Sequence, residues 1–316
     1  MQMHASARAQ LGAFDAMFYC IGAQRSGTTW LYRQLSKAPD IHMPSKEVHY
    51  WDSVRAPYRY WDDMGQGSAR SVSARLRPVL QAIRHRDPGA YRAERARLAM
   101  RQADPADASA YATYLCQNAG AARIVGDMTP SYALCAASTF SEMAGLHDRT
   151  RFLFLMRDPV DRFLSGLALR YRGSLAYRHD SATRARLIEE ALNDPHNPDL
   201  RRSRYDETLT RLYDAVPRDC VLPVFFEDLF TQSTMDGICD FLGMSRLVCD
   251  ATTKVNAWPG TSLTVPDALV DLVENRLAGT YHAVAHRLGD LPRAWRRPPQ
   301  GAEIVSLNSH AEQEAM

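Results

Sequence analysis

The chain has 316 residues, of which 46% are hydrophobic, so it can bury a full core and suits one large domain with or without insertions. Its formal net charge of +2 excludes a molecule that binds a polyanion by overall charge alone. Because the N-terminal residues lack a basic region followed by a long apolar one, and no apolar run approaches the roughly 20 residues that span a bilayer, we expect a cytoplasmic protein without membrane insertion.

Four short apolar runs rich in β-forming residues predict strands. They cover residues 16–21 (AMFYCI), 123–125 (RIV), 151–156 (RFLFLM) and 221–226 (VLPVFF). Such short and wholly apolar runs are typical of strands that are buried on both faces of a parallel sheet. Pro223 lies inside the last run, so this strand is expected to be weak or irregular.

Helical patterns alternate with these strands. We predict helices over residues 28–37, 160–171, 205–215 and 235–242. Strands that alternate with helices indicate an α/β fold, with three α/β/α layers around a central parallel sheet. Ligands of such sheets bind at the carboxyl ends of the strands.

Two segments and a tail do not fit the alternation. Residues 68–107 are rich in Arg and Ala and predict surface helices that break near 87–89, whereas 173–204 are polar with a turn at 193–198. Both segments are either solvated faces and loops or the walls of a substrate pocket. The sequence after Trp295, residues 296–316, predicts a disordered tail, which leaves one domain over 14–295.

The cysteines form no C-x-x-C pair, and several lie in apolar runs. They are Cys20, Cys116, Cys135, Cys220, Cys239 and Cys249. We interpret them as buried thiols in a reducing compartment, and not as a disulfide framework or a zinc site.

A modified phosphate-binding loop follows the first strand, GAQRSGTTW over residues 22–30. Its glycines have the spacing of the P-loop G-x-x-x-x-G-K-[ST], but Thr28 replaces the lysine that reaches the β- and γ-phosphates. The N–H groups of residues 25–29 can form an anion-binding nest at the helix N-terminus, with Arg25 at its mouth. This favours one phosphate that bears one further oxyanion over a triphosphate; the alternative is a turn that binds nothing.

This loop resembles the 5′-phosphosulfate loop of the sulfotransferases that use 3′-phosphoadenosine 5′-phosphosulfate (PAPS), where Lys or Arg usually occupies the place of Arg25. The resemblance implies that PAPS contacts Arg25, Ser26, Gly27, Thr28, Thr29 and Trp30. A second run, RFLFLMRDPVDRFLSGLALRYR, is similar to the family's 3′-phosphate motif, and the resemblance assigns the 3′-phosphate to Arg157 and Ser165. A forked guanidinium and a hydroxyl suit this group.

Further matches extend the resemblance along the chain. Residues 46–52 (KEVHYWD) resemble the K-E-x-H-[FY]-[FW] segment of the heparan-sulfate type and its bacterial relatives, and 126–132 (GDMTPSY) resemble their G-E-x-T-P-x-Y segment. Later landmarks follow in order at 203–205, 226–229 and 241–243.

One late loop departs from the family pattern. The heparan-sulfate enzymes have Asn followed by T-K-G-F, and the corresponding stretch here is 254–260, where Pro259 stands at the lysine position. Lys254 and Arg204 are the two candidates that could supply the charge. This departure weakens the case for a sulfated polysaccharide as acceptor.

The resemblance implies in-line transfer of a sulfuryl group from PAPS to a hydroxyl or amine of a small-molecule or carbohydrate acceptor. The nest amides, Arg25 and the hydroxyls of Thr28 and Thr29 would stabilise the charge that develops on the leaving phosphate, so no metal is required.

A carboxylate in the K-E-x-H segment is the expected general base. The family places Glu47 at the acceptor, where it can remove the acceptor proton, and Lys46 would touch the transferring group or tune Glu47. His49 is the competing base, because other sulfotransferase branches use histidine; its alternative is a structural role beside Tyr50 and Trp51.

Two rival functions use the same residues differently. A P-loop kinase or ATPase would use Asp127 as a magnesium acid but lacks the lysine at Thr28, and a non-catalytic nucleotide-binding protein would have no use for the K-E-x-H segment. Nucleic-acid binding is not expected, since the basic residues of 70–101 are dispersed among acids and alanines. The sequence predicts neither the acceptor nor the oligomeric state.

Overall fold

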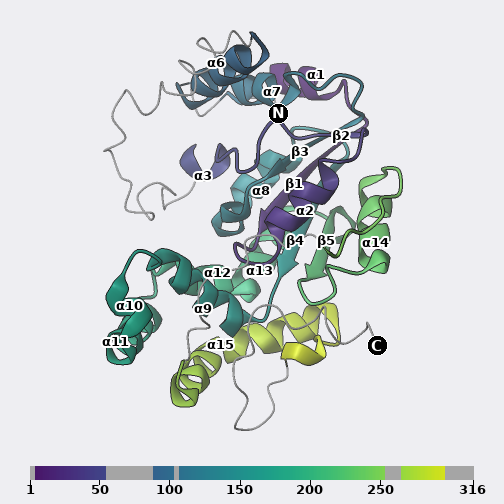
Figure 1. The fold of residues 1–316 in the computed structure, drawn as a ribbon. Helices are drawn as coiled ribbons and strands as arrows, with labels where there is room; N and C mark the ends of the chain where they lie inside the picture. Colours follow the sequence, from purple (N-terminus) through teal and green to yellow (C-terminus); the bar gives the residue numbers. More distant parts are fainter. Residues whose placement is uncertain (1–3, 55–87, 103–106, 253–264, 296–316) are drawn as a thin grey trace.

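A five-stranded parallel sheet with the strand order β2-β3-β1-β4-β5 forms the centre of the molecule (Figure 1). The computed structural model describes residues 4–54, 88–102, 107–252 and 265–295. Its strands are β1 (Ala16–Gly22), β2 (Ile41–His42), β3 (Ile124–Met128), β4 (Thr150–Met156) and β5 (Val221–Phe225). Every residue of the central strand β1 is buried, as expected for a strand with helices on both faces. The predicted α/β fold with a central parallel sheet is confirmed.

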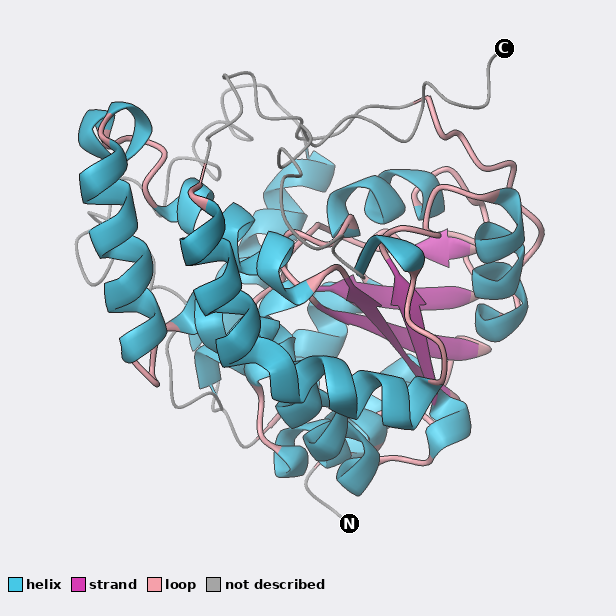
Figure 2. Cartoon of the chain, turned by 90° about the horizontal axis from the view of Figure 1, so that it is seen from below, coloured by secondary structure: helices cyan, strands magenta, loops and turns pink. Residues whose placement is uncertain are grey.

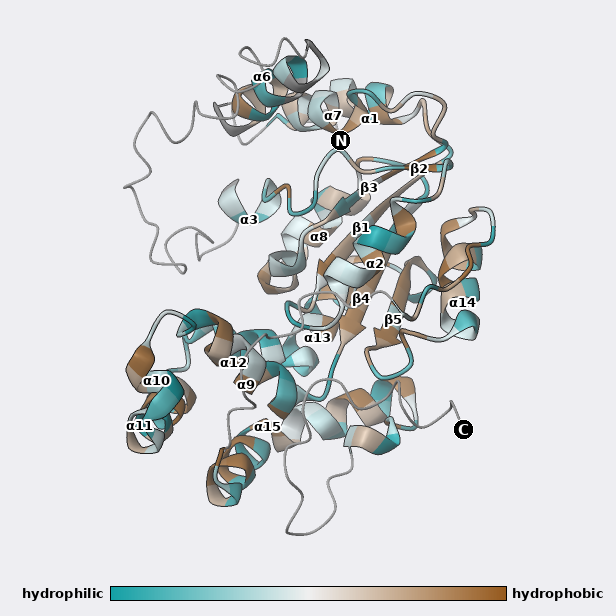
Figure 3. Cartoon of the chain, in the orientation of Figure 1, coloured by the Kyte–Doolittle hydropathy of each residue, from teal (hydrophilic) through white to brown (hydrophobic). Residues whose placement is uncertain are grey.

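Helices cover both faces of this sheet (Figure 2). Trp30, Leu31 and Leu35 of α2 (Thr28–Leu35) share one apolar cluster with α14 (Gln232–Leu242). The opposite face packs against α7 (Ser109–Cys116), α8 (Ala137–Ala144) and α13 (Tyr205–Ala215). Because side chains alternate along a strand, Phe18 and Cys20 belong to the first cluster whereas Met17 and Tyr19 belong to the second. The strands are accordingly among the most hydrophobic elements (Figure 3).

The remaining elements complete the chain. They are α1 (Ala5–Leu11), α3 (Trp51–Val54), α6 (Pro88–Gln102), η1 (Pro130–Leu134), α9 (Pro159–Arg170), α10 (Leu175–His179), α11 (Ser181–Asn193), α12 (Pro198–Ser203), η2 (Arg218–Cys220), α15 (Asp267–Leu288) and η3 (Arg293–Trp295). Within the described ranges, no helix is both long and apolar enough to cross a bilayer. All six cysteines lie in these ranges as free thiols. Burial is confirmed for Cys20, Cys135 and Cys239, but it was wrong for Cys116, Cys220 and Cys249, which are only partly buried.

The predicted strands and helices differ from the observed ones mainly at their ends. The second predicted strand, 123–125, covers only the start of β3, which continues through Gly126 to Met128. Glycine is a poor strand former, but the ring of Phe18 on the neighbouring strand occupies the space that a side chain at Gly126 would need. The helix predicted over 28–37 ends at Leu35, and the one predicted over 235–242 begins three residues earlier, at Gln232, where the Thr231 side chain caps it. The two-residue strand β2 was not predicted.

Pro223 lies within β5, where the sequence predicted weakness or irregularity. It pairs with Phe154 of β4 on one side, and β5 is the last strand of the sheet on the other. A proline lacks the backbone N–H that an inner strand must donate, so an edge strand can accept it.

The polar segment 173–204 is helical, so the interpretation of it as loop was wrong. Helices α10, α11 and α12 pack with α9 and α15 around a separate apolar cluster. Each of the three begins at a polar side chain that caps its first N–H groups: Ser174, Asp180 and Asn197. The predicted turn at 193–198 is confirmed between α11 and α12. The expectations for residues 68–87, 254–260 and 296–316 fall outside the described residues.

Replacing Gly126 should destabilise the fold. A Cβ there would overlap the Phe18 ring, which is fully buried and has little room to move, so Gly126→Ala is expected to lower the free energy of unfolding by about 1–3 kcal/mol. Gly237→Ala in α14 is the matched control, because its Cβ would meet open space and is expected to raise the same quantity by about 0.5–1 kcal/mol. Denaturant unfolding of both variants measures the difference; equal stabilities would contradict this packing argument.

Candidate active site

The loop between β1 and α2 has the strand–turn–helix geometry of an anion nest. Gly27 adopts a φ of +82° and caps α2, and a side chain there would collide with Leu229 and Phe226. Arg25 also has a positive φ, 74°, which turns its backbone sharply at the mouth of the loop. Ser26 and Thr28 are buried beneath it. Consecutive N–H groups in such a turn, at the start of a helix, favour an anion.

A cluster of cationic and hydroxyl groups joins this loop to the end of β4. The Nε of Arg25 donates a 3.0 Å hydrogen bond to the Oγ of Ser165 on α9. Burial, and then the positive charges of Arg157 and Arg162, lower the pKa of Arg25 from its usual value. Like charges in this arrangement repel one another, so a bound anion would relieve the repulsion.

Arg157 lies directly after β4 and is held in place from several sides. Its guanidinium stands over the ring of Phe226 at 5.1 Å and contacts Asp161 at 3.2 Å. Its backbone is fixed by Tyr205, whose hydroxyl donates to the Arg157 carbonyl at 2.8 Å. The structure therefore brings together Arg25, Arg157 and Ser165, three of the residues that the sequence assigned to PAPS. The hydrogen bond to Ser165 joins Arg25 of the loop to the helix that follows Arg157.

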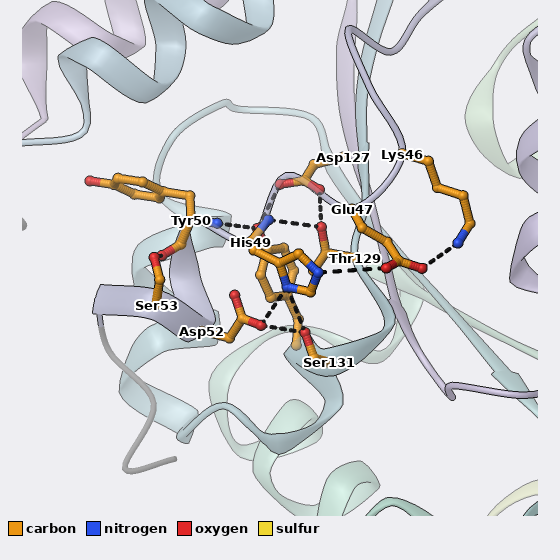
Figure 4. Close-up of polar contacts among 10 residues, drawn as sticks. Lys46, Glu47, His49, Tyr50, Asp52, Ser53, Asp127, Thr129 and Ser131 are labelled. Carbon is orange, nitrogen blue, oxygen red and sulfur yellow. Dashed lines mark hydrogen bonds and ion pairs between the residues drawn. The ribbon is translucent and has the colours of Figure 1, made fainter. Parts of the chain in front are cut away.

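Glu47 and His49 lie on a kinked segment beside the end of β3 (Figure 4). The Glu47 N–H donates to the Met128 carbonyl at 3.1 Å, and the φ angles of Glu47 and His49 are both positive, 62° and 58°. Left-handed conformations of residues other than glycine cost about 1–3 kcal/mol each and persist only where surrounding contacts hold them. This segment is therefore fixed by its neighbours.

The carboxylate of Glu47 pairs with two cations. Lys46 donates to its Oε1, and the Nε2 of His49 lies 3.6 Å from its Oε2. The other ring nitrogen of His49 lies 2.8 Å from Asp52, to which Ser131 also donates. His49 is thus placed between two carboxylates (Figure 4).

These contacts decide which group is charged at neutral pH. Burial alone would raise the pKa of Glu47, but the hydrogen bond from His49 and the charge of Lys46 outweigh it and lower the pKa to about 2. Burial alone would lower the pKa of His49, but Asp52 and Glu47 raise it to about 9. At pH 7, then, Glu47 is ionised and His49 carries a proton. Of the two bases that the sequence left open, Glu47 is therefore the deprotonated one.

Asp127 of β3 is completely buried and its oxygens are occupied by hydroxyl groups. Its Oδ1 accepts a hydrogen bond from Thr129 at 2.6 Å, and its Oδ2 accepts from Tyr111 and Tyr132, each at 2.8 Å. Burial raises the pKa of Asp127 to about 6, although these hydrogen bonds oppose the shift. A carboxylate saturated in this way is not arranged as the magnesium acid that the kinase alternative requires. Within the described part of the chain, no three His, Cys, Asp or Glu side chains cluster to hold a metal.

A small pocket of about 270 Å³ opens next to Lys46 and Glu47. Its lining residues are Pro44, Ser45, Lys46, Glu47, Val48, Glu94, Arg97 and Tyr114. Glu94 and Arg97 of α6 form an ion pair at 2.7 Å, and the hydroxyl of Tyr114 donates to Ser45 at 2.9 Å. Part of the segment 68–107, which the sequence suggested for a substrate wall, therefore lies beside Glu47.

Sequence reasoning missed the polar side chains that surround His49 and Asp127. They are Asp52, Tyr111, Thr129, Ser131 and Tyr132. The T-P-x-Y spacing at 129–132 was noticed, but nothing in the sequence shows that its hydroxyl groups face Asp127 and Asp52. Tyr111 lies outside this stretch, and no sequence motif indicates that it contacts Asp127.

Comparisons with known proteins agree with this geometry. A family model described as "Sulfotransferase family" matches residues 18–247. A sulfotransferase from Alicyclobacillus acidocaldarius is similar in structure, with a TM-score of 0.57 and 22% identity over 89% of this chain and 98% of that one.

The sulfotransferase domain of the Synechococcus PCC 7002 olefin synthase is also similar, with a TM-score of 0.53 and 19% identity over 88% of this chain and 96% of that one. At these identities the two structures speak for the fold alone. The comparison with curated proteins found no match. Because the family model covers most of the chain and includes the anion nest, Glu47 and Arg157, the chain belongs to the sulfotransferase family.

Proposed function

We propose that the protein transfers a sulfuryl group from PAPS to a hydroxyl or amine of a small-molecule or carbohydrate acceptor, with Glu47 as general base. The observation that carries this proposal is the Glu47 carboxylate, which Lys46 and His49 hold at the edge of the sheet where the anion nest also lies.

The cationic cluster supports PAPS as donor. Arg25, Arg157 and Ser165 offer two permanent charges and a hydroxyl, which is suited to the 3′-phosphate that distinguishes PAPS from ATP. The N–H groups of residues 25–29 and the hydroxyls of Thr28 and Thr29 would bind the phosphosulfate.

In the proposed reaction, the acceptor oxygen or nitrogen forms a bond to sulfur as the bond between sulfur and the bridging phosphate oxygen breaks. The acceptor proton passes to Glu47, and adenosine 3′,5′-bisphosphate (PAP) leaves. The nest amides stabilise the charge that develops on the leaving phosphate, and Lys46 and His49 keep the Glu47 carboxylate ionised and in place.

The pocket beside Glu47 supports α6 as one wall of the acceptor site. Glu94 and Arg97 line the same pocket as Glu47, the proposed base, and their side chains offer an acceptor and a donor of hydrogen bonds. A kinase or ATPase remains the weaker candidate, because Thr28 replaces the phosphate-binding lysine and the Asp127 carboxylate is saturated by hydroxyl groups.

Wild-type protein should move radiolabelled sulfate from PAPS into an acceptor in a metabolite extract of the source organism, and Glu47→Gln should abolish most of this transfer. Loss of a general base is expected to lower kcat about 100-fold or more, while the Kd for PAP changes by no more than about twofold. Glu94→Gln is the matched substitution in the same pocket; it should raise the acceptor KM and leave kcat within about threefold. Transfer by Glu47→Gln at the wild-type rate would exclude Glu47 as base.

Arg157→Ala tests whether the cationic cluster binds the 3′-phosphate. Losing a charged hydrogen-bond donor is expected to weaken PAP binding about 10- to 100-fold. AMP lacks the 3′-phosphate, so its affinity should be the same for variant and wild type. Calorimetric titration of both nucleotides gives the comparison, and an equal loss for PAP and AMP would show that Arg157 does not act on that group.

The rate of transfer should fall as the pH rises through about 9. His49 has its pKa raised to about 9, so the positive charge that pairs with Glu47 is present below that pH and is lost above it. Glu47 keeps its charge down to about pH 2 and should cause no decline near neutrality. A profile of kcat from pH 7 to 10 checks this, with His49→Gln as control: it should be slower at pH 7 and lack the decline near pH 9.

A further inference from the structure

The kinked segment that carries Glu47 and His49 is fixed through its backbone as well as its side chains. The His49 N–H donates to the Oγ of Thr129 at 3.4 Å, and the Tyr50 N–H donates to the hydroxyl of Tyr132 at 3.0 Å. These two hydrogen bonds hold the second and third residues after Glu47. They come from the stretch that follows β3, so they tie the segment to the sheet.

Both of these hydroxyl groups donate their own protons to Asp127. Thr129 reaches Oδ1 at 2.6 Å and Tyr132 reaches Oδ2 at 2.8 Å. An ionised carboxylate only accepts hydrogen bonds, so it orients both hydroxyl protons toward itself. The lone pairs of Thr129 and Tyr132 are then free to receive the two backbone N–H groups.

We propose that Asp127 is a positioning residue for the proposed sulfuryl transfer, which acts through Thr129 and Tyr132 to fix the backbone that carries Glu47 and His49. The inference rests on the proposed function of Glu47. It gives a role to the carboxylate that the kinase alternative would have used for magnesium.

Replacement of Asp127 by asparagine would disturb this arrangement without changing its size. One side of the amide accepts a hydrogen bond but the other donates, so one of the two hydroxyl groups would have to turn its proton away from position 127. That hydroxyl could then no longer receive its backbone N–H as it does now. The left-handed conformations of Glu47 and His49 would lose part of their support.

Tyr111 provides a matched control within the same cluster. Its hydroxyl donates to the same Oδ2 at 2.8 Å, but no hydrogen bond connects it to the N–H of His49 or Tyr50 in the described structure. Its ring stacks on Tyr50 at 4.5 Å, and phenylalanine would preserve that contact. Tyr111→Phe thus removes a hydrogen bond to Asp127 without removing a link to the segment.

The experiment compares Asp127→Asn, Thr129→Val, Thr129→Ser and Tyr111→Phe in the full-length protein. Each variant is measured for kcat with the acceptor found by labelled-sulfate transfer, for the Kd of PAP, and for amide hydrogen exchange in the peptide that contains residues 47–50. We expect Asp127→Asn and Thr129→Val to lower kcat about 10- to 100-fold and to speed exchange, with the Kd of PAP within about twofold. Thr129→Ser and Tyr111→Phe should stay within about threefold of wild type.

The contrast between valine and serine at position 129 keeps the test valid if Asp127→Asn does not fold, because valine keeps the size of threonine without its hydroxyl, whereas serine keeps the hydroxyl without the methyl group. A wild-type kcat for Thr129→Val, or a loss of kcat matched by an equal loss of PAP affinity, would overturn the inference. If no acceptor is found, the proposed function fails, but hydrogen exchange still tests the positioning role. Unchanged exchange at 47–50 in Thr129→Val overturns that role. Faster exchange supports it.

Discussion

The parallel register of β1, β3 and β4 is the constraint on which the site depends. Parallel strands deliver their carboxyl ends to one edge of a sheet. β1 lies between the other two, so the nest after Gly22, the hydroxyl groups after Met128 and the guanidinium of Arg157 after Met156 arrive at the same edge, although more than a hundred residues of sequence separate the nest from the other two. Each segment is short and begins directly at a buried strand, which leaves it little freedom to move.

Two groups of charged side chains lie at this edge, and they differ in how far neighbouring charges offset the cost of burying them. The positive charge of Arg157 lowers the pKa of the buried Arg25, although Asp161 pairs with Arg157, so this side of the site is suited to a further anion. Glu47, His49 and Asp52 form the other side, where each charge is matched by a neighbour. The first group is suited to binding and the second to holding a proton in a defined place. A transferase that binds an anionic donor and deprotonates its acceptor needs both.

The sequence predicted the fold and the nest well because both depend on local patterns. Short apolar runs and helical periods identified four of the five strands, and the glycines of the loop identified the nest. The helices of 173–204 were missed because their composition is polar, and their stability comes from capping side chains and from packing against α9 and α15. The hydroxyl groups around Asp127 were missed for a related reason. Their function depends on which atoms face one another across the sheet edge, and the bond between Arg25 and Ser165 likewise joins residues far apart in sequence.

The cluster of Arg25, Arg157 and Ser165 also bears on how the enzyme would turn over. In the proposed reaction the 3′-phosphate is chemically unchanged, so this cluster would hold the nucleotide as firmly after transfer as before it. PAP should therefore compete with PAPS for the free enzyme, and its departure can become the slowest step of the cycle. A lower affinity for the 3′-phosphate would speed the release of PAP, but it would also weaken the binding of PAPS when PAPS is scarce. The concentration of spent nucleotide around the enzyme would thus influence its rate as much as the supply of acceptor.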